Sequence, residues 1–140
     1  MKILIVTLAE SANIGSNGRL HIRGIVDTLI ASHGFPYTLP PMTLVLRFEL
    51  DHNDRAGDHP IRVDVVDGHG TLVSSIPGSY RAPWTDSGHR VVENSILPIQ
   101  VEEPIKWSGR LSFDVFWDDQ KLQSLAVEVI ESEADRRSRG

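Results

Sequence analysis

The feature that most constrains this chain is a repeated alternation of apolar and polar residues over short segments. From Leu44 to Leu50, and again from Leu111 to Trp117, every second residue is a large apolar one. Successive side chains of a strand point to opposite faces, so this spacing predicts strands with one buried face. No window of about ten residues carries the roughly 3.6-residue apolar period of an amphipathic helix. We therefore expect little helix.

Turn-forming residues separate the alternating segments. Asp67-Gly68-His69-Gly70 and Asp118-Asp119-Gln120 each join two such segments, which predicts two hairpins. Pro98 interrupts another segment and places it at a sheet edge, because proline cannot donate to a strand ladder. We expect about eight strands, with loops that include residues 10–18, 51–59 and 78–88. The strands are expected over residues 2–9, 19–31, 43–50, 61–65, 71–76, 90–101, 111–117 and 125–129.

Strands at this regular spacing are typical of antiparallel sandwiches and small barrels. The proline-containing connection that includes Phe35-Pro36 and Pro40-Pro41 suits a chain that crosses between sheets or runs along an edge. A barrel would also need enough chain to fill its interior. We therefore predict an all-β fold, namely an antiparallel Greek-key β-sandwich of the immunoglobulin-like or C2-like type.

Composition limits the classes of function. The 140 residues are enough for one domain, expected over residues 1–130, and the polar segment 131–140 is expected to be a disordered tail. The absence of cysteine excludes disulfides, thiolate metal sites and a cysteine nucleophile, and it fits a cytoplasmic protein. A net charge of −5 argues against nucleic acid as the partner. No apolar run reaches the roughly 18 residues of a membrane span.

Several segments, taken in order, resemble a family of small bacterial proteins that is defined only as a domain of unknown function. The resemblance covers residues 2–130 and implies a β-sandwich of bacterial or phage origin. It carries over no catalytic residue. The matching segments are Leu8-Ala9-Glu10, residues 18–27, Phe35-Pro36, residues 44–48, Asp67-Gly68 and Gly109 with Phe113-Asp114-Val115.

The acidic loops 51–59 and 118–121 are the candidate cation site. Calcium takes about six to eight oxygen ligands, which two loops at one end of a sandwich can supply together. However, the EF-hand pattern fails in the first loop, and no two histidines have the spacing of a zinc site. We expect solvated loops and no cofactor, and keep a ligand- or metal-binding site in these loops as the alternative. The candidate ligands are Asp51, Asp54, Asp58, Asp118 and Asp119.

Catalytic patterns are missing from the sequence. It contains neither Gly-x-Ser-x-Gly nor His-Glu-x-x-His. Asp86-Ser87-Gly88-His89 holds the residue types of a triad, but catalytic roles depend on geometry in space rather than adjacency in the chain. We therefore expect that the protein is not an enzyme.

Apolar residues at predicted solvent-facing positions indicate an interaction surface. Phe116, Val66 and Ile130 depart from the alternation, and Trp84 lies in a loop. Trp107, also in a loop, is expected to cover the core instead. We expect a protein-interaction or structural module that self-associates, as a possible homo-oligomer, or that docks on a partner protein.

Overall fold

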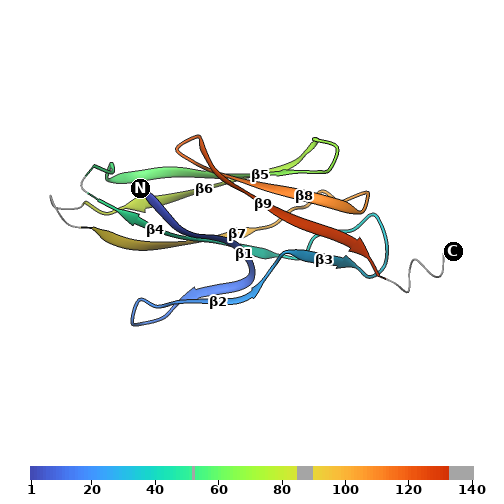
Figure 1. Cartoon of the computed structure of the whole chain (residues 1–140), viewed down its shortest axis with the longest axis horizontal. Coiled ribbons are helices and arrows are strands. Elements are labelled where there is room, and N and C mark those ends of the chain that lie inside the picture. Colours follow the sequence, from blue (N-terminus) through green and yellow to red (C-terminus); the bar gives the residue numbers. More distant parts are fainter. Residues whose placement is uncertain (52, 85–89, 133–140) are drawn as a thin grey trace.

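A computed structural model describes residues 1–51, 53–84 and 90–132, which form nine strands in two packed sheets (Figure 1). The described residues contain no helix. Accordingly, none of them forms a helix that is long and apolar enough to cross a membrane. The prediction of an all-β sandwich is confirmed.

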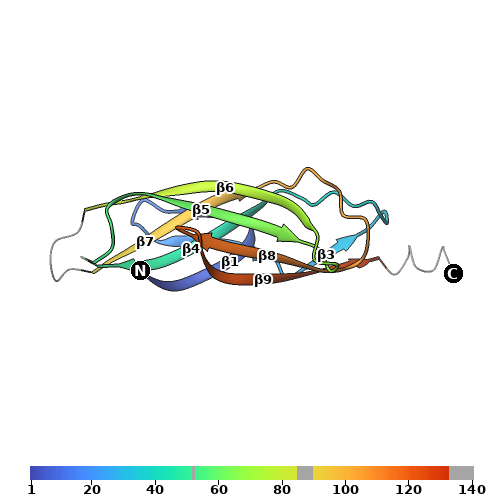
Figure 2. The same ribbon diagram turned by 90° about the horizontal axis from the view of Figure 1, so that it is seen from above.

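The first sheet has the strand order β2-β1-β4-β7 and the second has the order β3-β9-β8-β5-β6. The first sheet contains β1 (Lys2–Ile14), β2 (Leu20–Ile25), β4 (Met42–Leu50) and β7 (Val91–Ile99). The second contains β3 (Thr28–Ala31), β5 (Gly57–Val66), β6 (Leu72–Ala82), β8 (Gly109–Trp117) and β9 (Gln120–Glu131). Figure 2 shows the two layers from above.

Strands that follow one another in the chain often lie in different sheets, as the Greek-key prediction requires. β4 pairs with β7 in the first sheet, whereas β5 pairs with β8 in the second. The neighbouring strands are antiparallel except β3 and β9, which pair in parallel with Leu29 opposite Val129. The chain reaches β3 by crossing from the edge of the first sheet to the edge of the second.

The alternating side chains form the core between the sheets. Leu44, Leu46 and Phe48 of β4 are buried and face the second sheet, whose inward side chains include Phe113 and Val115. Burying each such side chain contributes about 1.5–3 kcal/mol relative to exposing it. Aromatic rings pack edge-on at one end of this core, where the Phe48 ring centroid lies 4.9 Å from that of Tyr80 and 5.0 Å from that of Trp117.

The predicted loop 10–18 is wrong at its start, because β1 continues to Ile14 and turns only afterwards. β1 pairs with β4 as far as Ala9 and from Ala9 onward pairs with β2. This two-stranded ribbon bends away from the rest of the first sheet, so that β2 lies below β4 and β7 in Figure 1. Gly24 permits the bend, since its φ is +67° and a Cβ there would lie 2.6 Å from the Glu10 side chain.

Other strand boundaries also differ from the predictions, and the strand predicted over residues 19–31 is divided into β2 and β3, which lie in different sheets. The loop predicted over residues 51–59 ends earlier, because β5 begins at Gly57 and includes Asp58 and His59. The segment predicted to be irregular from residue 78 instead continues β6 to Ala82, which pairs with Gly57. Both hairpins occur as predicted, and Pro98 lies in β7, at an edge of the first sheet.

Candidate functional site

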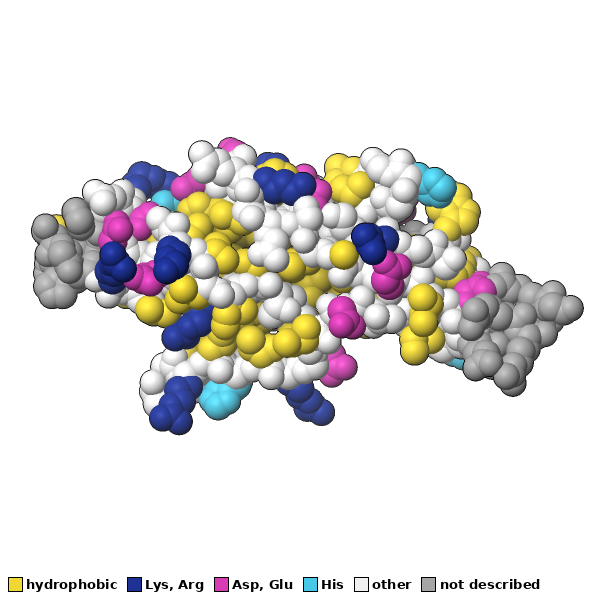
Figure 3. Space-filling view, viewed as in Figure 1, with side chains coloured by type: hydrophobic (Ala, Val, Ile, Leu, Met, Phe, Trp, Pro, Cys, Tyr) yellow, Lys and Arg dark blue, Asp and Glu magenta, His cyan; other side chains and the backbone are white. Residues whose placement is uncertain are grey.

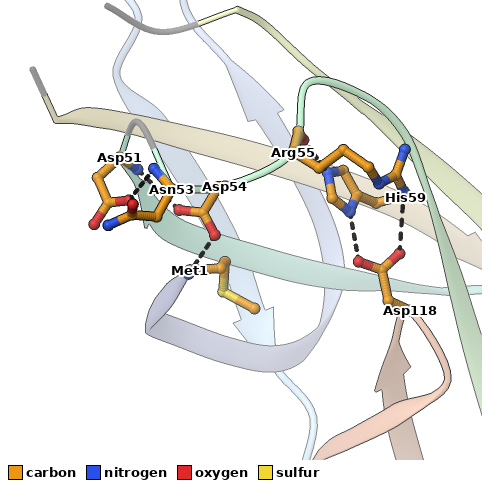
Figure 4. Close-up of polar contacts among 7 residues, drawn as sticks. All are labelled: Met1, Asp51, Asn53, Asp54, Arg55, His59 and Asp118. Atoms are coloured by element: carbon orange, nitrogen blue, oxygen red, sulfur yellow. Dashed lines mark hydrogen bonds and ion pairs between the residues drawn. The ribbon is translucent and has the colours of Figure 1, made fainter. Parts of the chain in front are cut away.

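The two acidic loops meet at one end of the sandwich, where His59 joins them (Figure 4). This side chain is only 4% exposed. Its Nδ1 lies 2.7 Å from the Asp118 Oδ2, and its Nε2 lies 2.6 Å from the Arg55 carbonyl oxygen. Trp117 stacks on the imidazole with a centroid distance of 4.9 Å and an interplanar angle of 24°.

His59 is held on both sides of its ring. One ring nitrogen lies within hydrogen-bond distance of the Asp118 carboxylate, and the other lies within hydrogen-bond distance of the Arg55 carbonyl oxygen. The Arg55 guanidinium lies 3.7 Å from the other oxygen of the same carboxylate. Both ring nitrogens are thus engaged in holding the loops together, and neither is open to an external substrate.

Asp54 is also held by protein donors. Its Oδ1 accepts a hydrogen bond from the Met1 ammonium at 2.5 Å, and its Oδ2 accepts one from the Asp51 amide at 2.9 Å. Partial burial alone would raise the pKa of Asp54, but these two hydrogen bonds and the nearby positive charges outweigh it and lower the pKa.

The remaining candidate cation ligands face other donors. Asp58 lies 3.8 Å from the Arg81 guanidinium, and the Asp119 Oδ1 lies 3.1 Å from that of Arg62. The Asp51 Oδ1 accepts a hydrogen bond from the Asn53 amide at 2.8 Å. No three His, Asp or Glu side chains gather as a metal site anywhere in residues 1–51, 53–84 and 90–132. The two loops thus converge, but their carboxylates are directed toward protein groups.

Three of the predicted interaction residues lie on the outer face of the second sheet. Phe116 is half-buried there, because the Arg62 guanidinium lies over its ring at 4.1 Å from the centroid. Val66 is half-buried near the end of β5, and Ile130 is exposed beside Ile30 of the parallel strand β3. Trp84 does not share this face. It is 77% exposed and adjoins residues 85–89, which lie outside the described residues, as do 133–140 of the predicted tail.

The rest of this outer face is polar near Phe116. The Asp114 Oδ1 accepts hydrogen bonds from the Ser112 and Ser124 hydroxyls at 2.6 and 2.7 Å, and the Lys121 ammonium lies 3.7 Å away. Partial burial alone would raise the pKa of Asp114, but these donors lower it. The surroundings of Phe116 therefore resemble an ordinary solvated sheet face.

A groove of about 440 Å³ opens at the opposite end of β5, between residues 67–73 and 103–111. Ile105 and Leu111 line it and are themselves buried, whereas Trp107 is 57% and Leu72 55% exposed. The His69 ring meets the Trp107 ring edge-on, with centroids 5.0 Å apart and an interplanar angle of 74°. We call this feature the tryptophan groove.

Local contacts fix both walls of the tryptophan groove. The Asp67 Oδ1 accepts hydrogen bonds from the His69 and Thr71 amides, each 2.9 Å long, which closes the hairpin turn. On the other wall, Ile105 exchanges two backbone hydrogen bonds of 2.8 Å with Tyr37. Ile105 therefore turns inward in this loop. The prediction that Trp107 covers the core is wrong, because Ile105 takes that position and leaves the tryptophan outside.

The comparisons with known proteins identify a family and leave the chemistry open. The model of a family of unknown function, DUF6941, matches residues 4–130. The chain belongs to this family. The match confirms the resemblance to a domain of unknown function, and it covers all of the DUF6941 sandwich except the ends of β1 and β9.

Among solved structures, the DUF6941 chain is similar to an immunoglobulin-like protein from Pseudomonas aeruginosa. The two share 14% sequence identity with a TM-score of 0.39, over 87% of this chain and 95% of the other. A search of curated protein sequences finds no match.

Sequence reasoning missed the tryptophan groove in this DUF6941 chain. It placed His69 in a hairpin turn and Trp107 over the core, and no pattern in the sequence indicated that the two side chains are in contact. Their contact connects two segments that are far apart in the chain. A tryptophan flanked by Lys106 and Ser108 was the one available signal, since polar neighbours are unusual for a core position.

Proposed function

We propose that this protein is a non-enzymatic interaction module that binds an extended segment of a partner protein in the tryptophan groove. The observation that carries the proposal is the position of Trp107. It is more than half exposed, and it packs edge-on against the His69 ring beside a buried apolar floor. Tryptophan is among the residues that most often dominate protein interfaces.

Energetics support this role for Trp107. Fully burying a large apolar side chain stabilises a protein or complex by about 1.5–3 kcal/mol relative to leaving it exposed. The isolated chain lacks much of this stabilisation at Trp107. A bound segment that covers Trp107 and Leu72 would recover it. The groove volume lies within the range of about 300–1,000 Å³ that is usual for ligand sites. Its exposed rim carries both signs of charge, with Glu103 opposed by Lys106 and Arg110, which suits a polypeptide better than an anion.

The absence of catalysis is part of the proposal. His59 supports it, because this buried histidine uses both ring nitrogens to hold the acidic loops together. A general base needs a nitrogen within hydrogen-bond reach of its substrate.

Selection of short peptides from a displayed library on the full chain tests the proposal. We expect selected peptides to quench tryptophan fluorescence, and to lose binding to a Trp107→Ala variant by about tenfold or more. Trp84→Ala is the matched control, since Trp84 is at least as exposed but lies elsewhere. Peptides that bind both variants equally well, or no selected peptide at all, would contradict the proposal.

A further inference from the structure

The outer edge of β1 between Lys2 and Thr7 has no strand beside it among the described residues. β4 pairs with the other side of this segment. β2 joins β1 only from Ala9 onward, and the Leu8 carbonyl already accepts a hydrogen bond from the Val26 amide. Figure 1 shows that the ribbon formed with β2 bends away below this edge, so that it does not cover it. We call residues 2–7 the β1 edge.

The composition of the β1 edge is unusual for an unpaired strand. Ile3, Leu4, Ile5 and Val6 follow one another, and Lys2 is the only charged residue in the segment. Exposed edges are normally blocked by charges, proline or a bulge, because an apolar edge is a template for another strand. The β1 edge has two of these features, namely Lys2 at its beginning and a bulge at Leu4, but the bulge presents an apolar side chain that is 41% exposed. Two other edge strands carry prolines, namely Pro77 in β6 and Pro98 in β7.

The β1 edge borders an apolar seam between the two sheets. Across the seam lies β9, which β3 pairs with only from Glu128 onward. The half-buried side chains along the seam are apolar, namely Ile3 and Val6 of β1 and Leu122 and Leu125 of β9. Figure 3 shows hydrophobic side chains along the opening between these two strands. A strand added to the β1 edge would cover this seam.

The charges around the β1 edge favour a second copy as the added strand. Lys2 is exposed at the beginning of the edge, whereas Glu10 and Asp27 are exposed beyond its end. When two identical strands pair antiparallel about a two-fold axis, the beginning of each strand lies beside the end of the other. Lys2 of each copy then approaches the acidic end of the other.

We propose that two copies of this chain pair antiparallel through their β1 edges and form a symmetric dimer with one continuous first sheet. The pairing satisfies the backbone groups of both edges and covers both apolar seams. The dimer uses a surface separate from the tryptophan groove. A failure of the dimer proposal would therefore leave the proposed function unaffected, and the reverse also holds.

Substitution of the bulged residue tests the pairing. We expect the full chain to be a dimer by native mass spectrometry, and Leu4→Glu to raise its dissociation constant about tenfold or more, because two carboxylates would be desolvated near the axis. Val92→Glu is the matched control, since Val92 is 45% exposed on β7, the other edge of the same sheet. A monomeric wild-type chain, or a dimer weakened by Val92→Glu and not by Leu4→Glu, would overturn the proposal.

A charge exchange tests the orientation of the two copies. Lys2→Glu is expected to weaken the dimer, because it places like charges at the two contacts between Lys2 of one copy and Asp27 of the other. The double variant Lys2→Glu with Asp27→Lys is expected to restore the dimer, because it exchanges the two charges and makes both contacts attractive again. If the double variant is weaker than the single one, the antiparallel arrangement is wrong.

Hydrogen exchange on the unmodified chain avoids any effect of substitution on folding. Protection of the amides of residues 3–7 should increase with protein concentration as the dimer forms, while the amides of β7 stay unchanged. Protection that does not depend on concentration would overturn the pairing.

Discussion

At the scale of single residues, one buried histidine connects the loop before β5 to the turn after β8. The turn itself needs unusual backbone, since φ is +49° at Asp118 and +64° at Asp119. Aspartate tolerates this conformation better than most residues. Asp118 therefore has two roles, because it both forms the turn and supplies the carboxylate that pairs with His59.

Replacing His59 with leucine should destabilise the fold by about 1–3 kcal/mol, because the Arg55 carbonyl and Asp118 lose their hydrogen-bond partners on the buried ring. Urea denaturation followed by tryptophan fluorescence measures this loss. His33→Leu is the matched control, since His33 is exposed and its substitution should change the free energy of unfolding by less than about 0.5 kcal/mol. Equal effects of the two substitutions would show that the histidine bridge contributes no stability.

The sequence indicated that Asp118 and loop 51–59 lie near each other, but it did not indicate the hydrogen bond between His59 and Asp118. It placed Asp118 and loop 51–59 in a common site, because acidic loops at one end of a sandwich are expected to converge. It predicted solvated loops and kept a cation site as the alternative. It could not predict the protein partner of Asp118, because a carboxylate's partner depends on side-chain direction. That direction follows from β5 beginning at Gly57, which turns His59 inward.

At the scale of elements, local patterns predicted the hairpins well and the long-range pairings poorly. The β5–β6 and β8–β9 hairpins follow from alternation around a recognisable turn. The parallel pairing of β3 with β9 has no local pattern, because four residues are too few to show a period. The end of β6 was also missed, since Gly78 suggested a loop.

Gly78 lies within β6 because a side chain from the other sheet needs its space. A Cβ there would lie 2.6 Å from the Leu97 Cδ1. Gly78→Ala should therefore cost about 1–3 kcal/mol by overpacking. In a Leu97→Ala background the same change should be neutral or slightly stabilising, since alanine restricts the unfolded chain more than glycine. A double-mutant cycle by chemical denaturation measures the difference, and additive effects would refute the contact.

At the scale of the whole molecule, the sandwich could be predicted because strands such as β4 and β8 repeat the same two-residue period. The functional surfaces could not, because each combines segments from distant parts of the chain. Phe116 illustrates the limit. Its position on a solvent-facing row was inferred correctly, but the Arg62 guanidinium that lies over it comes from the neighbouring strand β5.

The arrangement of acidic groups also predicts how the molecule responds to metals. We expect millimolar calcium or zinc to leave the melting temperature unchanged, because the candidate carboxylates are already paired with protein donors. A ligand that binds only the folded state would raise it by mass action. Differential scanning calorimetry with and without a chelator provides the measurement. A rise of several degrees that Asp118→Asn abolishes would favour the alternative of a metal site in the acidic loops.

The pairing of β3 with β9 has a consequence for synthesis of the chain. β3 is made early, but its partner β9 follows all the other described strands in the chain. Until β9 is made, the edge of β8 that pairs with it lacks a neighbour, and the second sheet cannot close over the core. Pairings between such distant segments form slowly, and unpaired edges are prone to aggregation while they wait. The newly made chain therefore depends on protection from aggregation until β9 is free to pair.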